Sequence, residues 1–305
     1  MMRWAGLVAA LVLACAGPAA ADVVRASYNA RQYRLYEPDA PARGRPLVVA
    51  LHGCAQTPDD FATATRLDRA AGRRGLRVVY PAQARANNVA RCWNWFASSA
   101  VRGPGEVDEL LELIRHVQQS RGVESPEIVV IGFSAGAYMA VNLACAAPDV
   151  IVGVGAVAGG PYGCAATSGG PIQCMRGERL DGEAAASRCG ATSEKLRASL
   201  WHGDGDSVVS PANLTALTTM FLRVRGLMPP AAGRGATSRE PVGTPEQVDG
   251  ARRTVYRTAD GRSVIETWVV PGMGHAWSGG DSRGSHTYPA GPDATEAMLR
   301  FLVDP

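Results

Sequence analysis

Short apolar runs alternate along the chain with segments in which apolar residues recur at helical spacing. Residues 46–51, 76–80 and 127–131 are nearly continuous apolar runs, which is typical of strands covered on both faces in a parallel sheet. Residues 59–72 and 106–119 place apolar side chains every three or four positions, which predicts helices. The chain therefore begins as a strand–helix–strand sequence.

The same rhythm continues toward the C-terminus. Further elements are predicted in four places: strands at 151–157, 198–202 and 264–270, and a closing helix at 292–302. This alternation predicts an α/β fold, with a doubly wound, mostly parallel sheet and helices on both faces. Residues 226–250 are rich in Gly, Pro and Thr and carry no period, so we interpret them as a surface excursion. We expect residues 22–305 to form a single domain.

The first 21 residues differ in character from the rest. Arg3 gives a positive start, residues 7–14 form a short apolar core, and three alanines end at Ala21. This is the pattern of a secretory signal peptide, with cleavage expected after Ala21. A second interpretation is a lipoprotein anchored through Cys15, although the residues before it fit a lipid-attachment box poorly.

The composition indicates a globular protein. Of the 305 residues, 46% are hydrophobic and 19% are charged, a balance unlike that of disordered chains. The formal net charge of +3 is too small for a nucleic-acid-binding surface, so we expect no nucleic-acid partner. Beyond the leader, no apolar run reaches the roughly 18 residues of a membrane span.

Six of the 7 cysteines follow the leader, and an even number in an exported chain favours disulfides. Spacing alone leaves their pairing open. The six are Cys54, Cys92, Cys145, Cys164, Cys174 and Cys189. No C-x-x-C pattern and no Cys/His cluster with metal-ligand spacing occurs, so no metal site is expected.

Residues 132–136 (GFSAG) fit the pattern G-x-S-x-G, and their surroundings make the match informative. The predicted strand 127–131 precedes them and a helix-compatible segment, 137–146, follows. Such a sharp strand–turn–helix connection, a nucleophile elbow, exposes a serine hydroxyl at the apex of the turn. We therefore predict Ser134 as a nucleophile; the alternative is an ordinary turn capped by serine.

A serine hydroxyl needs a base to attack near neutral pH. Of the 5 histidines, His275 lies in the glycine-rich segment 271–277, just after a predicted strand. From there it can reach a serine at the same sheet edge, so we predict it as the base. His52 and His202 also end predicted strands, and are the alternative bases or else structural histidines.

The base must be oriented by an acid. Residues 201–209 (WHGDGDSVV) offer two carboxylates after a predicted strand. The spacing H-G-x-x-D-x-x-V selects Asp206, and leaves Asp204 as the alternative or as a residue that holds the turn. The order Ser134, Asp206, His275 is that of an α/β-hydrolase and differs from that of chymotrypsin and subtilisin.

Attack by the serine would create an oxyanion that needs hydrogen-bond donors. The early strand 46–51 runs into His52, Gly53 and Cys54. We predict that the backbone N–H groups of Cys54 and Ala135 form the oxyanion hole. The alternative is that the His-Gly pair merely closes the strand.

Seven segments together resemble the polyhydroxybutyrate depolymerase family of secreted esterases, within the wider group that includes feruloyl and acetylxylan esterases. They occur in family order over nearly the whole mature chain: LHGCAQTPDDFA (51–62), RVVYPAQ (77–83), RCWNWF (91–96), GFSAGAYMA (132–140), AGGPYGCA (158–165), HGDGDSVVSPAN (202–213) and PGMGHAWSGG (271–280). The resemblance implies an α/β-hydrolase fold and a triad of Ser134, Asp206 and His275.

The resemblance also implies a Cys54–Cys92 disulfide. This bond would link residues 52–54, which we call the oxyanion loop, to the segment 91–96. We expect a second bridge, Cys164–Cys174. Cys145 and Cys189 are left over, and either pair or leave Cys145 as a buried thiol. Three tryptophans fall on loops beside the proposed site and are candidates for substrate contact, the alternative being that they fill the core: Trp93, Trp95 and Trp277.

These features predict a secreted serine esterase that hydrolyses carboxylic esters of the poly- or oligo-3-hydroxybutyrate type through an acyl-enzyme. Feruloyl or acetyl esters of plant polysaccharide are the alternative substrates. The same scaffold could also serve a serine peptidase, an acyltransferase or a catalytically silent binding protein. The chemistry needs no metal or organic cofactor, and we expect a monomer whose partner is the ester substrate.

Overall fold

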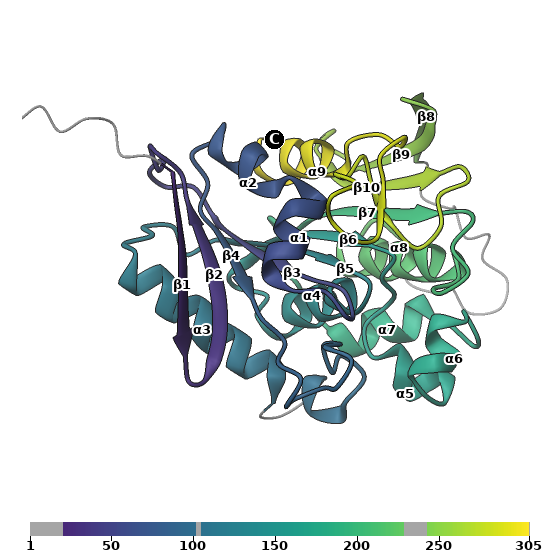
Figure 1. The fold of residues 1–305 in the computed structure, drawn as a ribbon. Helices are drawn as coiled ribbons and strands as arrows, with labels where there is room; N and C mark the ends of the chain where they lie inside the picture. Colours follow the sequence, from purple (N-terminus) through teal and green to yellow (C-terminus); the bar gives the residue numbers. More distant parts are fainter. Residues whose placement is uncertain (1–20, 102–104, 229–242, 305) are drawn as a thin grey trace, which may run out of the picture.

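The computed structural model describes residues 21–101, 105–228 and 243–304. Its centre is a ten-stranded sheet in the order β1-β2-β4-β3-β5-β6-β7-β10-β9-β8 (Figure 1). Six neighbouring strands are parallel: β4 (Val78–Pro81), β3 (Leu47–Leu51), β5 (Ile128–Phe133), β6 (Ile151–Val157), β7 (Arg197–Gly203) and β10 (Ser263–Val270). The predicted α/β fold with a mostly parallel sheet is confirmed.

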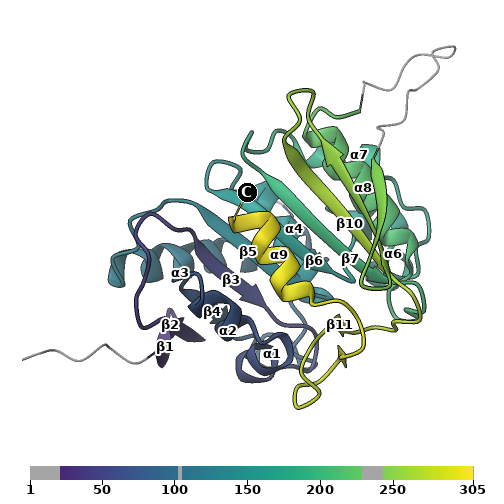
Figure 2. The ribbon, with the colours of Figure 1, turned by 90° about the horizontal axis from the view of Figure 1, so that it is seen from above.

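Helices cover both faces of the sheet, and Figure 2 shows α1, α2 and α9 together on one side of it. The helices of this face are α1 (Pro58–Thr65), α2 (Leu67–Gly72) and α9 (Ala294–Val303). Those of the other face are α3 (Glu106–Ser120), α4 (Ala135–Ala146) and α8 (Ala212–Val224). Each face has its own apolar core, one containing Phe61 and Met298 and the other Leu110 and Leu217. Because both faces are covered, the central strands β3, β5 and β6 contain no polar side chain.

The sequence pattern did not predict several helices and strands correctly. The helix predicted over 59–72 is two helices, because Arg66 adopts a left-handed conformation with φ 54°. The antiparallel hairpin of β1 (Asp22–Tyr28) and β2 (Arg31–Glu37) forms one edge of the sheet. At the other edge lie β8 (Thr244–Val248) and β9 (Ala251–Arg257). Strands β1 and β8 are mostly exposed and β2 buries Arg31 and Arg34, so none of the three shows a continuous apolar run.

The position of β8 corrects part of one prediction. We interpreted residues 226–250 as a surface excursion because they carry no period, but their last part is a strand that pairs with β9. Residues 229–242 of that segment lie outside the described residues, as do residues 1–20 of the predicted leader. The remaining short elements are η1 (Ser98–Ala100), α5 (Cys164–Ser168), α6 (Pro171–Met175), α7 (Gly182–Cys189), β11 (Trp277–Ser278) and β12 (Thr287–Tyr288).

Three disulfides join parts of the described chain. They are Cys54–Cys92, Cys145–Cys189 and Cys164–Cys174. The two cysteines left over in the sequence therefore pair with each other, and their bond ties the end of α4 to the end of α7. Within residues 21–101, 105–228 and 243–304, no helix combines the length and the apolar character needed to cross a membrane.

Candidate active site

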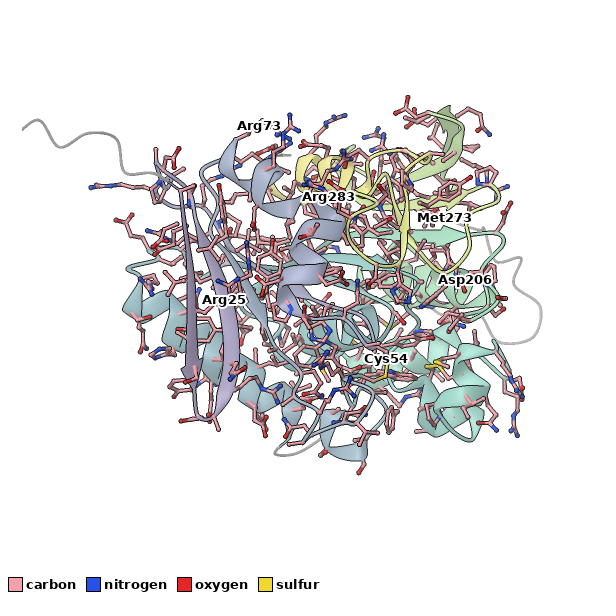
Figure 3. The ribbon with its side chains drawn as sticks, in the orientation of Figure 1. Arg25, Cys54, Arg73, Asp206, Met273 and Arg283 are labelled. Carbon is pink, nitrogen blue, oxygen red and sulfur yellow. A yellow bond between two sulfur atoms is a disulfide. The ribbon has the colours of Figure 1, made fainter. Side chains whose placement is uncertain are left out.

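The proposed chemical groups gather where the parallel strands end. Ser134 follows β5, Asp206 follows β7, and His275 follows β10. Cys54 follows β3, the strand next to β5. Figure 3 places Asp206 close to Met273, which lies in the segment 271–277 that carries His275, and shows Cys54 toward the middle of the molecule. The carboxyl edge of one sheet thus collects residues that are more than 200 positions apart in the chain (54 to 275).

Ser134 occupies a strained turn between β5 and α4. Its φ of 54° and ψ of −122° lie outside the regions favoured by residues with a side chain. A Cβ atom on Gly132 would come within 2.2 Å of the carbonyl oxygen of Gly136, and one on Gly136 within 2.1 Å of that of Leu51. The two glycines are therefore required because the turn brings backbone against backbone on both sides of the serine.

Hydrogen bonds connect the three predicted triad residues in a row. The Nε2 atom of His275 lies 2.9 Å from the Oγ atom of Ser134, and its Nδ1 atom lies 2.8 Å from Oδ2 of Asp206. The other carboxylate oxygen, Oδ1, accepts the backbone N–H groups of Val208 and Val209 at 2.8 and 2.9 Å. Because the carboxylate of Asp206 can only accept, Nδ1 of a neutral His275 carries the proton and donates it to this hydrogen bond. The other nitrogen, Nε2, is then free to accept the proton of Ser134.

The electrostatics of Asp206 suit this role. Its side chain is fully buried (0% exposed), and burial by itself would raise the pKa of the carboxyl group. The hydrogen bond and charge of His275 and the two backbone N–H donors outweigh burial, so the pKa lies below its ordinary value. Asp206 therefore stays ionised beside the imidazole near neutral pH.

The alternative acid and base have other positions. Oδ1 of Asp204 accepts the backbone N–H of Gly272 at 2.7 Å, and so holds the loop that carries His275. His202 is buried, and its Nε2 atom lies 2.9 Å from the carbonyl oxygen of Val209. Burial lowers the pKa of His202, which keeps the ring neutral. Both residues support the loops around Asp206 without touching Ser134 through a hydrogen bond.

The predicted oxyanion donors are open at the end of β3 and the start of α4. In the described part of the chain, the backbone N–H groups of Cys54 and Ala135 have no hydrogen-bond acceptor. The neighbouring N–H of Gly53, in contrast, donates to the side chain of Gln56 at 2.8 Å. Two donors beside a serine hydroxyl are what a tetrahedral acyl intermediate requires.

The family model described as esterase PHB depolymerase matches residues 31–244. The chain belongs to this family. It is 31% identical to poly(3-hydroxyalkanoate) depolymerase C of Paucimonas lemoignei, over 81% of this chain and 58% of the relative. It is 27% identical to feruloyl esterase B of Talaromyces funiculosus, over 80% of this chain and 69% of the relative. The chain therefore spans somewhat more than half the length of the first relative.

Solved structures show the same fold. An acetyl xylan esterase from Aspergillus awamori aligns with a TM-score of 0.67 at 20% sequence identity, covering 83% of this chain and 94% of that one. A feruloyl esterase module from Clostridium thermocellum aligns with a TM-score of 0.51 at 16% identity, covering 85% of this chain and 83% of that one. The predicted family resemblance and the α/β-hydrolase fold are thus confirmed, and the relatives and neighbours bear the names of carboxylic ester hydrolases.

Gln56 has a position that the sequence analysis missed. The residue is 3% exposed, and its Oε1 atom accepts the N–H of Gly53. Its Nε2 atom donates to Oδ2 of Asp60 at 2.9 Å and to Oγ of Ser285 at 3.2 Å. Gln56 thereby fixes the peptide next to the predicted donor at Cys54. The segment LHGCAQ contains the residue, but nothing local reveals its contact with Ser285.

We expect Gln56→Ala to lower kcat roughly 10- to 100-fold with little change in KM, because a displaced oxyanion donor weakens the transition state more than the bound ester. Steady-state kinetics with p-nitrophenyl butyrate measure both constants. Gln118→Ala is the matched control. Gln118 lies on α3, where its side chain likewise donates to a loop, to the carbonyl oxygen of Ser125 at 3.0 Å. An unchanged kcat for Gln56→Ala would contradict this role.

The structure buries the three tryptophans proposed for substrate contact. Trp93 is 0%, Trp277 is 1% and Trp95 is 5% exposed. The indole N–H of Trp93 donates to the carbonyl oxygen of His52 at 3.0 Å, and that of Trp277 to Oγ1 of Thr295 at 3.1 Å. Trp93 and Trp277 offer no surface to a substrate, so that prediction is corrected: they pack the core, and Trp93 also anchors the strand end before the oxyanion loop.

His52 is a structural histidine of the same loop. Its Nε2 atom accepts the backbone N–H of Gln83 at 3.2 Å, and its Nδ1 atom lies 2.7 Å from the carbonyl oxygen of Gly53. The ring is therefore neutral, with the proton on Nδ1. Burial lowers the pKa of His52 to about 4.

This pKa predicts acid sensitivity. The pKa of His52 is about 4 in the folded chain and 6.5 in the unfolded chain. Between pH 4 and pH 6.5 the unfolded chain therefore binds more protons at this residue than the folded chain does. The free energy of unfolding is therefore highest above pH 6.5. As the pH falls to 4, it decreases by about 3 kcal/mol through this one group. Urea unfolding at pH 7.5 and 4.5 should show a smaller loss in His52→Gln than in the wild type. Equal losses would show that His52 does not drive the pH dependence.

Proposed function

We propose that the chain is a secreted serine esterase that cleaves carboxylic esters of the poly- or oligo-3-hydroxybutyrate type through an acyl-enzyme. The observation that carries the proposal is the position of His275, which is hydrogen-bonded at once to Ser134 and to Asp206. The strained turn under the serine and the two unpaired N–H groups beside it supply the rest of an acyl-transfer site.

The mechanism follows from these contacts. The Oγ atom of Ser134 attacks the ester carbonyl carbon while its proton passes to Nε2 of His275. Asp206 stabilises the imidazolium, and the N–H groups of Cys54 and Ala135 bind the oxyanion. The imidazolium then protonates the leaving alcohol, which departs from the acyl-enzyme. In the second half, His275 takes a proton from water, whose oxygen attacks the acyl carbon. The imidazolium then returns this proton to the Oγ atom of Ser134 as the bond to the serine breaks and the acid is released.

The substrate class rests on the relatives. The chain is 31% identical to a protein named poly(3-hydroxyalkanoate) depolymerase C, which favours hydroxyalkanoate esters. Its 27% identity to feruloyl esterase B keeps acyl groups on plant polysaccharide as the second candidate. Secretion is supported by the three disulfides, since such bonds persist in oxidising compartments.

Product release from a matched set of esters tests the proposal. The set is hydroxybutyrate oligomer, solid polymer, methyl ferulate and acetylated xylan, with p-nitrophenyl butyrate as the general ester and Ser134→Ala protein as blank. We expect release of hydroxybutyrate. Release of ferulate or acetate alone would transfer the same chemistry to polysaccharide esters, and no release from any ester would contradict the proposed function.

A further inference from the structure

A cavity of about 1100 Å³ lies beside the oxyanion loop and has no assigned role. Its walls are residues 25–34 of the β1–β2 hairpin, residues 56–59 at the start of α1, residues 82–87 after β4, Arg91, and Glu109 and Glu112 of α3. It lies at the same edge of the sheet as the triad, because the N-terminal part of antiparallel β2 runs beside the end of β4. None of the triad residues lines it. In the view of Figure 3, Cys54 lies between Arg25 of this cavity and Asp206 of the triad.

The cavity and the oxyanion loop share a wall. Arg91 precedes Cys92, whose Cα atom is 4.2 Å from that of Cys54 across the disulfide. Consecutive Cα atoms are about 3.8 Å apart, so the Cα atoms of Arg91 and Cys54 are at most about 8 Å apart. The two segments also hydrogen-bond directly, from the N–H of Ala55 to the carbonyl oxygen of Ala90 at 2.7 Å. A substrate held at the oxyanion loop therefore lies within reach of the cavity.

The acidic groups of the cavity already have partners. Asp59 accepts from Arg25 at 2.8 Å, and Glu109 accepts from Arg31 at 2.5 Å. Glu112 accepts from the side chain of Asn29 at 3.3 Å. Arginines thus neutralise Asp59 and Glu109, whereas Glu112 bonds to a neutral amide. Five arginines line the cavity against these three carboxylates, so its lining keeps a net positive charge.

Two arginines of the cavity have no acidic partner among the described residues. Arg85 is exposed and donates only to the carbonyl oxygen of Val89, at 2.9 Å. Arg91 is half-buried, with no hydrogen bond or ion pair from its guanidinium within the described part of the chain. Its backbone is also strained, with φ 52°. A partly buried charge without a counterion favours an anionic ligand, and arginine matches a carboxylate in two parallel hydrogen bonds.

We propose that this cavity binds a carboxylate carried on the alcohol side of the ester, with Arg91 as its main contact. The inference rests on the proposed function, since the alcohol side of a hydroxyacid oligomer ends in a free carboxylate. The uronic acid of an acylated polysaccharide offers the same chemistry. The cavity thus selects esters whose leaving alcohol is anionic.

Calorimetry tests the binding without turnover. The protein is the Ser134→Ala variant, and the ligands are the 3-hydroxybutyrate trimer as free acid and as methyl ester, with methyl glucuronoside and its methyl ester as the second source. We expect the free acid of one source to bind about tenfold more tightly than its methyl ester, and Arg91→Gln in the same background to remove the difference. Arg121→Gln, which lies outside the cavity and pairs with Glu37, should preserve it.

The outcomes separate this inference from the proposed function. Equal binding of acid and ester, or equal weakening of both by Arg91→Gln, would overturn the carboxylate site. Hydrolysis of p-nitrophenyl butyrate by otherwise wild-type Arg121→Gln protein should keep its wild-type rate, because Arg121 pairs with Glu37 and lies outside the cavity. Failure of the wild type to hydrolyse any ester would overturn the proposed function instead. The calorimetric comparison would still show whether the cavity binds a carboxylate.

Discussion

Replacing Ser134 by alanine is expected to lower kcat for p-nitrophenyl butyrate about 10⁶-fold, since loss of a serine-protease nucleophile has an effect of this order. The hydroxyl lies 2.9 Å from the base, and the described residues place no other hydroxyl within hydrogen-bond distance of it. The small remaining rate would come from water attacking an ester that is polarised by the N–H groups of Cys54 and Ala135.

The fold should survive this change, because the side chain is small and the strained turn depends on Gly132 and Gly136. Thermal unfolding of Ser134→Ala should therefore match that of the wild type. Ser187→Ala on α7, whose hydroxyl donates to the carbonyl oxygen of Glu183 at 3.1 Å, is the control for activity. Adding His275→Ala to Ser134→Ala should cause little further loss, because the two residues act as one unit. Retention of more than about a thousandth of the wild-type rate would contradict the assignment of the nucleophile.

The central strands could be predicted from the sequence because burial on both faces leaves a continuous apolar run. Strand β5 is buried at every position, and the segment 127–131 shows this directly. Strand β8, by comparison, has the sequence TPEQV and is mostly exposed, so only its pairing with β9 defines it. The break at Arg66 carries no glycine or proline to mark it. Local patterns therefore predicted the interior and missed the edges.

The candidate site divides along a similar line. Ser134 and His275 lie in short motifs whose glycines shape the backbone, and the structure brings the two side chains into contact. The role of Gln56 depends on Ser285, which is 229 positions away, so no local motif contains it. The prediction of substrate contact was wrong for Trp93 and Trp277 for a related reason. A motif can place Trp93 on a loop, but only the packing shows that its ring is buried in the core.

The two carboxylates after β7 allow a sharper test than the nucleophile does. Oδ1 of Asp206 accepts two backbone N–H groups, from Val208 and Val209, so in Asp206→Asn the amide oxygen must take that position. The amide NH₂ then faces Nδ1 of His275, which has to accept rather than donate. The proton moves to Nε2, and the imidazole can no longer take the proton of Ser134.

We therefore expect Asp206→Asn to lower kcat about 10⁴-fold, as for the wrong imidazole tautomer in serine proteases. Asp204→Asn is the matched control. Among the described residues, the side chain of Asp204 accepts only the N–H of Gly272, at 2.7 Å, and an asparagine oxygen can accept it equally well. Its kcat for p-nitrophenyl butyrate should stay within about threefold of the wild type. If Asp204→Asn instead caused the larger loss, the imidazole would be oriented through the loop, and the direct 2.8 Å contact with Asp206 would not be the catalytic one.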